Sequence, residues 1–175
     1  MDLFKVPCKA ILEAADLANG VPMPEGLSFH LDRRPEVDAI RALYAASPLR
    51  RPIQDPARVR RMFEGSNVVI SAYAGDRLVG LLRGWTDFVY DGYVCDLAIH
   101  PAFQKAGVGR RLLDLAMGLG AGIQWVLLAS PIARDYYAHL GWQKVENGWS
   151  LSREGWNPGS VDDFQAQYAE LAARA

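Results

Sequence analysis

The chain has 175 residues, of which 50% are apolar and 22% charged, and its formal net charge is −1. This length predicts one domain with a sizeable core, and the near balance of charge excludes the basic surface that nucleic-acid-binding proteins need. The two cysteines, Cys8 and Cys95, exclude a disulfide framework and closely spaced zinc ligands, and no apolar run is long enough to cross a membrane.

Apolar spacing and turn residues predict an alternation of helices and strands along the chain. The expected elements are helix 6–19, strand 27–31, helices 35–46 and 56–64, strands 67–74, 77–85 and 93–99, helix 107–119, strand 124–129, helix 131–140, a hairpin of 142–145 with 149–152, and helix 161–173. Successive strands favour an antiparallel meander, and the later strand–helix–strand order favours a parallel crossover. The predicted fold class is therefore α+β, with a mixed, mostly antiparallel twisted sheet and helices on both faces.

Several residues define the ends of these elements. Pro35 is expected in the first turn of its helix, and Asp55 is expected to cap the next one. Gly75 and Asp76 predict a tight hairpin turn, and Gly141 predicts a helix end. The apolar strand 124–129 is expected to lie in the centre of the sheet.

The segment from Tyr93 to Leu113 carries the most specific chemical signal. A strand ends at Pro101, a loop with two glycines follows, and an amphipathic helix begins near Arg110. The first N–H groups of a helix have no intrahelical partner and attract anions, and glycines allow a ligand to approach the backbone closely. The segment therefore favours a phosphate site, with a plain helix start as the alternative. The loop matches neither the Walker nor the Rossmann pattern.

Two separated motifs resemble the GNAT superfamily of N-acyltransferases. Gln104-x-x-Gly107-x-Gly109 is similar to the acetyl-CoA signature of that family, and residues 133–142, with Tyr136-Tyr137 and Leu140-Gly141, are similar to its closing segment. The resemblance covers about residues 27–152 and is strongest to small bacterial and chloroplast-type members. It implies an acetyltransferase domain over 27–153. The leader at 1–26 lies outside the resemblance, as do the loop and helix at 154–175, which are expected to pack on the same domain.

The resemblance implies one activity, and three other activities or roles remain as alternatives. It implies a cytoplasmic, acetyl-CoA-dependent N-acetyltransferase, in which a primary amine of a small molecule or peptide attacks the thioester directly in a ternary complex. The alternatives are a non-catalytic CoA-binding regulatory module, a transferase of another acyl group, and a transferase to an alcohol. No metal, nucleic acid or membrane is expected to take part, and the leader and tail could serve a homodimer.

The resemblance also implies a set of residues for acetyl-CoA. The backbone of the glycine loop would hold the pyrophosphate, the main chain of the preceding strand would hold the pantetheine and thioester, and Ser130 would take the place of a cofactor-contacting Asn. The loop residues are Gln104, Lys105, Ala106, Gly107, Val108, Gly109 and Arg110, and the strand residues are Leu97, Ala98 and Ile99.

Two residues are candidates for the catalytic proton transfers. Tyr137 matches the tyrosine that lies near the thiol sulfur in many family members and is the expected acid; packing in an aromatic core is the alternative. Asp96 is the expected base, directly or through water, because a carboxylate on a central strand is unusual unless it is used or paired. Strand alternation places Asp96 on the face opposite Leu97 and Ile99, and His100 and His139 are the runners-up, so the base stays open.

The acceptor is not encoded in a readable motif. The resemblance implies that residues 49–54, 86–92 and 146–149 build its groove. Asp87, Asp91 and nearby aromatic residues would suit a cationic or aromatic amine. Arginines at 50, 51, 58, 60 and 61 would suit an acidic acceptor, although a solvated surface is the simpler interpretation.

Overall fold

The computed structural model describes residues 26–31 and 33–150. These residues fall into two compact units, each described by itself. The first unit ends at Leu127, and the second begins at Leu128. The helices expected at 6–19 and 161–173 lie outside the described residues. Within the described ranges, no helix combines the length and the apolar composition needed to cross a membrane.

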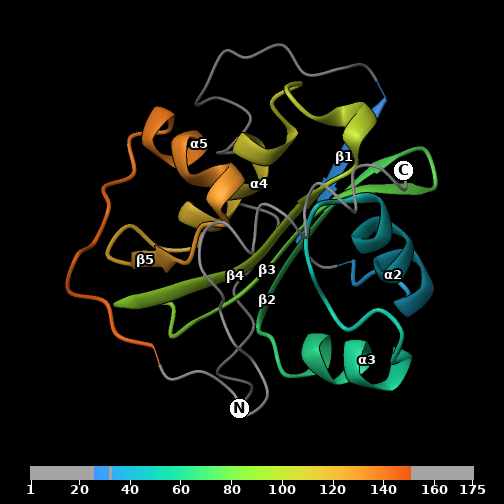
Figure 1. The fold of residues 1–175 in the computed structure, drawn as a ribbon, viewed down its shortest axis with the longest axis horizontal. Coiled ribbons are helices and arrows are strands. Elements are labelled where there is room, and N and C mark those ends of the chain that lie inside the picture. The colour runs from blue at the N-terminus through green and yellow to red at the C-terminus, as the bar shows by residue number, and fades with distance from the viewer. Residues whose placement is uncertain (1–25, 32, 151–175) are drawn as a thin grey trace. The chain divides into compact units, whose positions relative to one another are not determined.

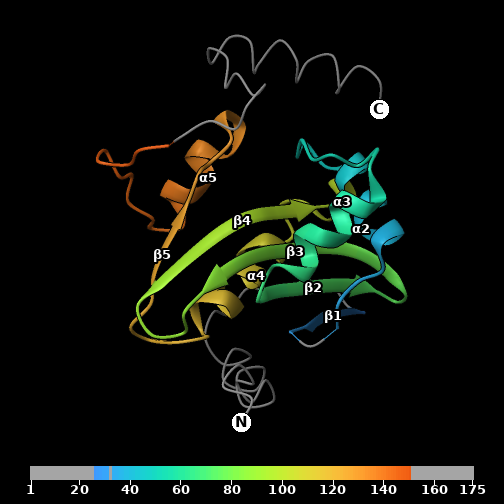
Figure 2. The same ribbon diagram turned by 90° about the horizontal axis from the view of Figure 1, so that it is seen from below.

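The described residues of the first unit form five strands and three α-helices (Figures 1 and 2). Its elements are β1 (Leu27–His30), α2 (Val37–Ala46), α3 (Pro56–Glu64), β2 (Val68–Ala74), β3 (Arg77–Thr86), β4 (Asp91–Ile99), the 3₁₀ turn η1 (Pro101–Phe103), α4 (Val108–Met117) and β5 (Gln124–Leu127). The sheet order is β1-β2-β3-β4-β5; the first four strands are antiparallel, and β5 runs parallel to β4. The predicted mixed α+β fold class is confirmed.

The ends of α3 follow the local signals in the sequence. Asp55 accepts a hydrogen bond from the Arg58 N–H at 2.9 Å, and Pro56 occupies the first turn, where its missing N–H costs nothing. Helix α2 differs from the prediction: it begins at Val37 with Glu36 as its N-cap, so Pro35 precedes the helix. Strand β4 begins two residues before the predicted start at Tyr93, because the tight turn at Asp87 brings Asp91 into pairing.

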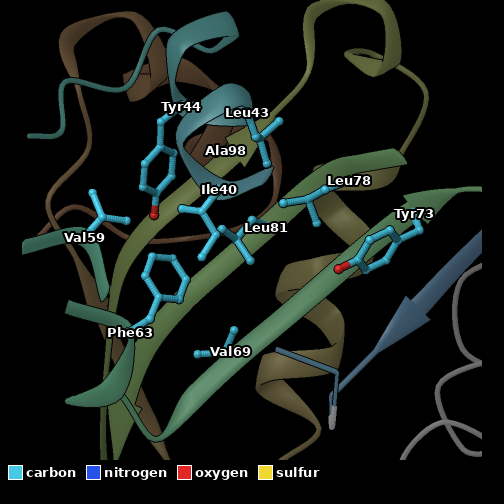
Figure 3. Packing of buried hydrophobic residues seen from close by; sticks show 10 residues of the cluster. All are labelled: Ile40, Leu43, Tyr44, Val59, Phe63, Val69, Tyr73, Leu78, Leu81 and Ala98. Carbon is cyan, nitrogen blue, oxygen red and sulfur yellow. The ribbon is translucent and has the colours of Figure 1, made fainter. Parts of the chain in front are cut away.

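The core of the first unit lies between the sheet and helices α2 and α3 (Figure 3). It consists of Ile40, Leu43, Tyr44, Val59, Phe63, Val69, Tyr73, Leu78, Leu81 and Ala98. Helix α4 covers the opposite face, where Val108 and Leu112 pack against Gly80 of β3. This arrangement confirms helices on both faces of the sheet.

Strand β5 corrects one expectation about the sheet. Predicted as central, it pairs only with β4 among the described strands and is therefore an edge strand in this part of the chain. An apolar run does not by itself reveal the position of a strand in a sheet, because helices can cover an edge strand on both faces.

The second unit contains the 3₁₀ turn η2 (Pro131–Ala133) and helix α5 (Arg134–His139). The predicted helix 131–140 thus begins as a tighter turn. Gly141 ends α5 in a left-handed conformation with φ 83°, as predicted. The expected strand 142–145 is wrong, since this segment is irregular and largely exposed. Strand propensity depends on packing against neighbouring strands, which these residues lack in the described ranges.

Gly80→Ala is expected to lower the free energy of unfolding by about 1–3 kcal/mol, the usual cost of overpacking a tight core. A Cβ at Gly80 would lie 2.9 Å from Val108 Cγ1 of α4 and 3.1 Å from Ala72 Cβ of β2, so the packing between α4 and the sheet would have to shift. The measurement is chemical denaturation. Gly148→Ala is the control, because its new methyl group would approach no atom closer than 4.0 Å; equal stability of the two variants would contradict this packing.

Candidate active site

Strand β4 loses its partner on one side partway along its length. The parallel pairing of β4 with β5 ends at Val94 and Leu127, so residues 95–99 have no described partner strand on that edge. On its other side, β4 has a bulge, because Arg83 pairs with Asp96 whereas the next residue, Gly84, pairs with Val94. Unpaired backbone N–H and C=O groups at a strand edge can bind an extended, amide-containing ligand. Leu97, Ala98 and Ile99 all belong to this edge segment.

The glycine loop leads directly into the N-terminus of α4. Gly107 is the N-cap residue and has φ 81°, a conformation that a residue with a Cβ adopts only under strain. Its carbonyl accepts the hydrogen bond from the Arg111 N–H at 2.9 Å, so the amides of Val108, Gly109 and Arg110 lie before the first intrahelical bond. This geometry can hold an anion at the helix N-terminus.

The other loop residues surround this N-terminus. The Gln104 side-chain amide donates to the Ile99 carbonyl at 3.2 Å, which ties the loop to the end of β4. Lys105 is exposed and also has a positive φ, 61°. Arg110 is exposed and lies 3.8 Å from Asp114 one turn along α4. The structure thus brings the seven predicted loop residues and the three predicted strand residues together at one end of β4.

Asp96 is buried and bonded on both carboxylate oxygens. Its exposed fraction is 1%. Oδ1 accepts a hydrogen bond from Arg51 Nε and forms an ion pair with Arg51 Nη2, while Oδ2 accepts from Arg83 Nε and, at 2.9 Å, from the Tyr44 hydroxyl. A carboxylate offers about four lone-pair sites, and here it accepts three hydrogen bonds and forms one further ion-pair contact. Asp96 as the direct base stays a prediction, and these contacts favour an ion-pair role.

The partners of Asp96 come from three different elements. Arg51 belongs to the segment between α2 and α3, Tyr44 to α2 and Arg83 to β3. Arg83 also donates to Ser66 Oγ at 3.0 Å, and burial together with Asp96 raises the pKa of Tyr44. We call Arg51, Asp96, Arg83 and Tyr44 the buried ion-pair cluster. Sequence reasoning missed it; the only signal was a carboxylate on an otherwise apolar strand.

Cys95 lies in the bulge beside this cluster. Burial raises the pKa of its thiol to about 12, although Arg83 lowers it somewhat. The thiol is therefore uncharged at neutral pH and is a poor nucleophile. Among the residues that the structure describes, no group of three or more His, Cys, Asp or Glu could hold a metal ion.

The second unit carries the two other predicted site residues. Tyr137 belongs to α5 and packs against the rings of Tyr136 and Trp142, with centroids 5.4 and 5.8 Å away. Burial raises the pKa of Tyr137 to about 12, so its hydroxyl stays protonated through the physiological range. Ser130 is the N-cap of η2, where its carbonyl accepts from the Ala133 N–H at 2.9 Å.

The remaining candidate side chains make contacts within the protein. His100 accepts from the Ala102 N–H through Nδ1 and contacts Arg77 through Nε2, and burial and Arg77 lower its pKa. His139 Nδ1 lies 2.6 Å from the Asp135 carbonyl. Asp87 Oδ1 accepts from three successive backbone amides of its own turn, which lower its pKa.

Comparison with known proteins identifies relatives of this chain. The protein-family model described as acetyltransferase (GNAT) domain matches residues 46–155 of this sequence. An uncharacterized ycf52-like N-acetyltransferase from Prochlorococcus marinus is 32% identical over 106 residues, and an uncharacterized ycf52 N-acetyltransferase from Pyropia yezoensis is 30% identical over 107 residues. Each alignment covers 57% of this chain, and the chain spans 57% and 60% of the lengths of these two relatives.

Solved structures share the fold. A GNAT-family protein from Xanthomonas campestris pv. campestris has a TM-score of 0.63 at 22% identity, covering 80% of this chain and 99% of its own. An acetyltransferase from Thermus thermophilus has a TM-score of 0.59 at 17% identity, with coverages of 73% and 92%. At these identities the likeness establishes the fold.

Proposed function

This chain belongs to the GNAT family of acetyltransferases, and from that membership we propose that it transfers the acetyl group of acetyl-CoA to a primary amine in the cytoplasm. The observation that carries the proposal is the junction of β4 and α4. There, an unpaired strand edge leads through a glycine loop into a helix N-terminus with a left-handed Gly107. We assign the acetyltransferase domain to residues 27–153.

The residues of this junction fit the two chemically different ends of acetyl-CoA. The helix N-terminal amides of Val108, Gly109 and Arg110 suit the pyrophosphate, which is anionic. The strand edge at Leu97, Ala98 and Ile99 suits the pantetheine arm, which contains amides. When bound, acetyl-CoA supplies the acetyl group as a reactive thioester. Backbone N–H groups that point at a developing negative charge on oxygen lower the barrier to acyl transfer.

We propose direct transfer to the amine within a ternary complex. Cys95 belongs to the same edge segment of β4, and its raised pKa keeps the thiol protonated, which argues against an acetyl-cysteine intermediate. Asp96 accepts three hydrogen bonds and is ion-paired with two arginines, so we propose that water or the bulk solvent receives the amine proton. The proposed acid is the Tyr137 hydroxyl, which holds a proton for the departing thiolate.

Tyr137→Phe is expected to lower kcat by about 10²–10⁴-fold, the usual contribution of a positioned acid, while the Kd for CoA changes less than about twofold. Because burial raises the pKa of Tyr137 to about 12, the native rate should not fall between pH 8 and pH 10, where a tyrosine with an ordinary pKa would begin to lose its proton. Steady-state kinetics across this range measure both effects. Tyr136→Phe is the control, and equal rates for the two variants would exclude Tyr137 as the acid.

The experiment that tests the proposed function is an acetyl-transfer assay of the purified chain with a panel of amines. The panel contains an arylalkylamine, a polyamine and a lysine peptide, and release of free CoA is the readout. Transfer to at least one amine supports the proposal. CoA binding without transfer to any of them would favour the alternative of a CoA-binding regulatory module.

A further inference from the structure

Arg51 is the member of the buried ion-pair cluster that reaches the protein surface. Its side chain is 25% exposed, whereas those of Arg83 and Asp96 are 7% and 0% exposed. It is also the member that belongs to no helix or strand, since it lies in the segment between α2 and α3. Its position therefore depends on how that segment is held.

The segment is held on its inner side by independent contacts. Leu49 and Ile53 pack against the core, and Arg41 Nε of α2 donates to the Ile53 carbonyl at 2.7 Å. A turn bonds the Ile53 N–H to the Arg51 carbonyl at 2.7 Å. The backbone of Arg51 is thus fixed relative to α2, and its side chain extends from that fixed backbone toward β4.

The guanidinium of Arg51 binds the bulge of β4 at two successive residues. Nε donates to the Asp96 carboxylate, with which Nη2 forms an ion pair, and Nη2 donates to the Cys95 carbonyl at 2.9 Å. The third nitrogen, Nη1, donates to the Arg50 carbonyl at 2.6 Å. The carbonyl of Cys95 belongs to the same peptide unit as the N–H of Asp96, so this contact sets the orientation of that peptide plane.

The bulge coincides with the end of the β4–β5 pairing. Cys95 is the first residue of β4 beyond the last pair, Val94 with Leu127, and it is also the extra residue in the pairing with β3. Neither neighbouring strand therefore fixes this peptide fully. A rigid bidentate guanidinium can do so, whereas an ammonium group makes a single-point contact without a defined plane.

We propose that Arg51 is a positioning residue for acetyl transfer, which fixes the Cys95–Asp96 peptide at the start of the strand edge that receives the thioester. The inference rests on the proposed function, because it assigns a catalytic purpose to that edge. It goes beyond it by coupling the α2–α3 segment, which lies far from the glycine loop in sequence, to the geometry of the reaction. Arg51 touches no reacting atom in this account.

The test compares Arg51→Lys with the native protein, using hydroxylamine as the acceptor. Hydroxylamine is small and mostly unprotonated at neutral pH, so it requires neither a shaped acceptor groove nor a base. The readouts are the enzyme-dependent kcat and KM for acetyl-CoA, the Kd for CoA from calorimetry, and the melting temperature. Arg33→Lys is the matched control, because Arg33 stacks on Tyr73 of β2, a strand separated from β4 by β3.

The expected result for Arg51→Lys is a kcat lowered by about 10- to 100-fold, in line with the loss that a misplacement of about 1 Å produces, with the Kd for CoA within about twofold of the native value. The control should keep native kcat. An unchanged kcat, a parallel loss of CoA affinity, or an unfolded variant would each overturn the positioning role. Absence of CoA binding by the native protein, or of enzyme-dependent transfer both to hydroxylamine and to every amine of the panel, would instead overturn the proposed function and this inference with it.

Discussion

Asp96→Asn is expected to lower the free energy of unfolding by about 3–5 kcal/mol, the range observed when one partner of a buried ion pair is removed. The carboxylate neutralises two guanidinium groups, and the substitution would leave the Arg83 side chain, which is 7% exposed, in the core without a counter-charge. The NH₂ group of the asparagine would also face Tyr44 or the arginines, which are themselves hydrogen-bond donors to this side chain, so hydrogen bonds would be lost. Chemical denaturation followed by tryptophan fluorescence measures the change.

Asp38→Asn provides the matched control for this substitution. Asp38 also contacts an arginine, Arg41, at 2.8 Å, but its side chain is 88% exposed. Exposed ion pairs contribute about 0–1 kcal/mol, so the control should lose at most that amount. If Asp96→Asn kept native stability and lost catalysis, the ion-pair role would be wrong and Asp96 as the base, as predicted from the sequence, would be favoured.

Gly107→Glu is expected to weaken CoA binding by on the order of 100-fold or more, since placing like charges together at an interface costs several kcal/mol and each 1.4 kcal/mol is a factor of ten. The new carboxylate would lie at the N-cap of α4, where it would compete with the pyrophosphate for the helix amides. Isothermal titration calorimetry with CoA measures the loss.

The control for Gly107→Glu must carry the same backbone strain. Gly75→Glu meets this condition, because Gly75 also has a left-handed φ, 58°, and a Cβ added there would meet no atom within 4 Å. It belongs to the β2–β3 turn, remote in sequence from the glycine loop. Equal loss of CoA affinity in both variants would mean that strain, and not the site, causes the effect.

The features that the sequence predicted correctly depend on residues that are neighbours in the chain. The cap of α3 by Asp55, the left-handed end of α5 at Gly141 and the strand–loop–helix junction at Gly107 are each determined within a few positions. Local hydrogen bonds and backbone sterics are sufficient for such features.

The features that the sequence did not reveal depend on residues far apart in the chain. The Tyr44 hydroxyl binds Asp96 across 52 positions, and Arg51 binds it across 45. From its sequence alone the arginine-rich segment indicates a solvated surface or an acceptor site, whereas the Arg51 side chain binds the buried Asp96. The edge position of β5 and the irregular 142–145 segment were missed for the same reason, since strand pairing is decided by distant partners.

The most direct test of the central claim is a calorimetric titration of the purified chain with acetyl-CoA. We predict saturable binding of one molecule per chain, which CoA displaces in a competition titration, as expected for a site formed by the edge of β4 and the N-terminus of α4. The absence of detectable binding at millimolar acetyl-CoA would contradict the account, and the glycine loop would then be only the start of a helix.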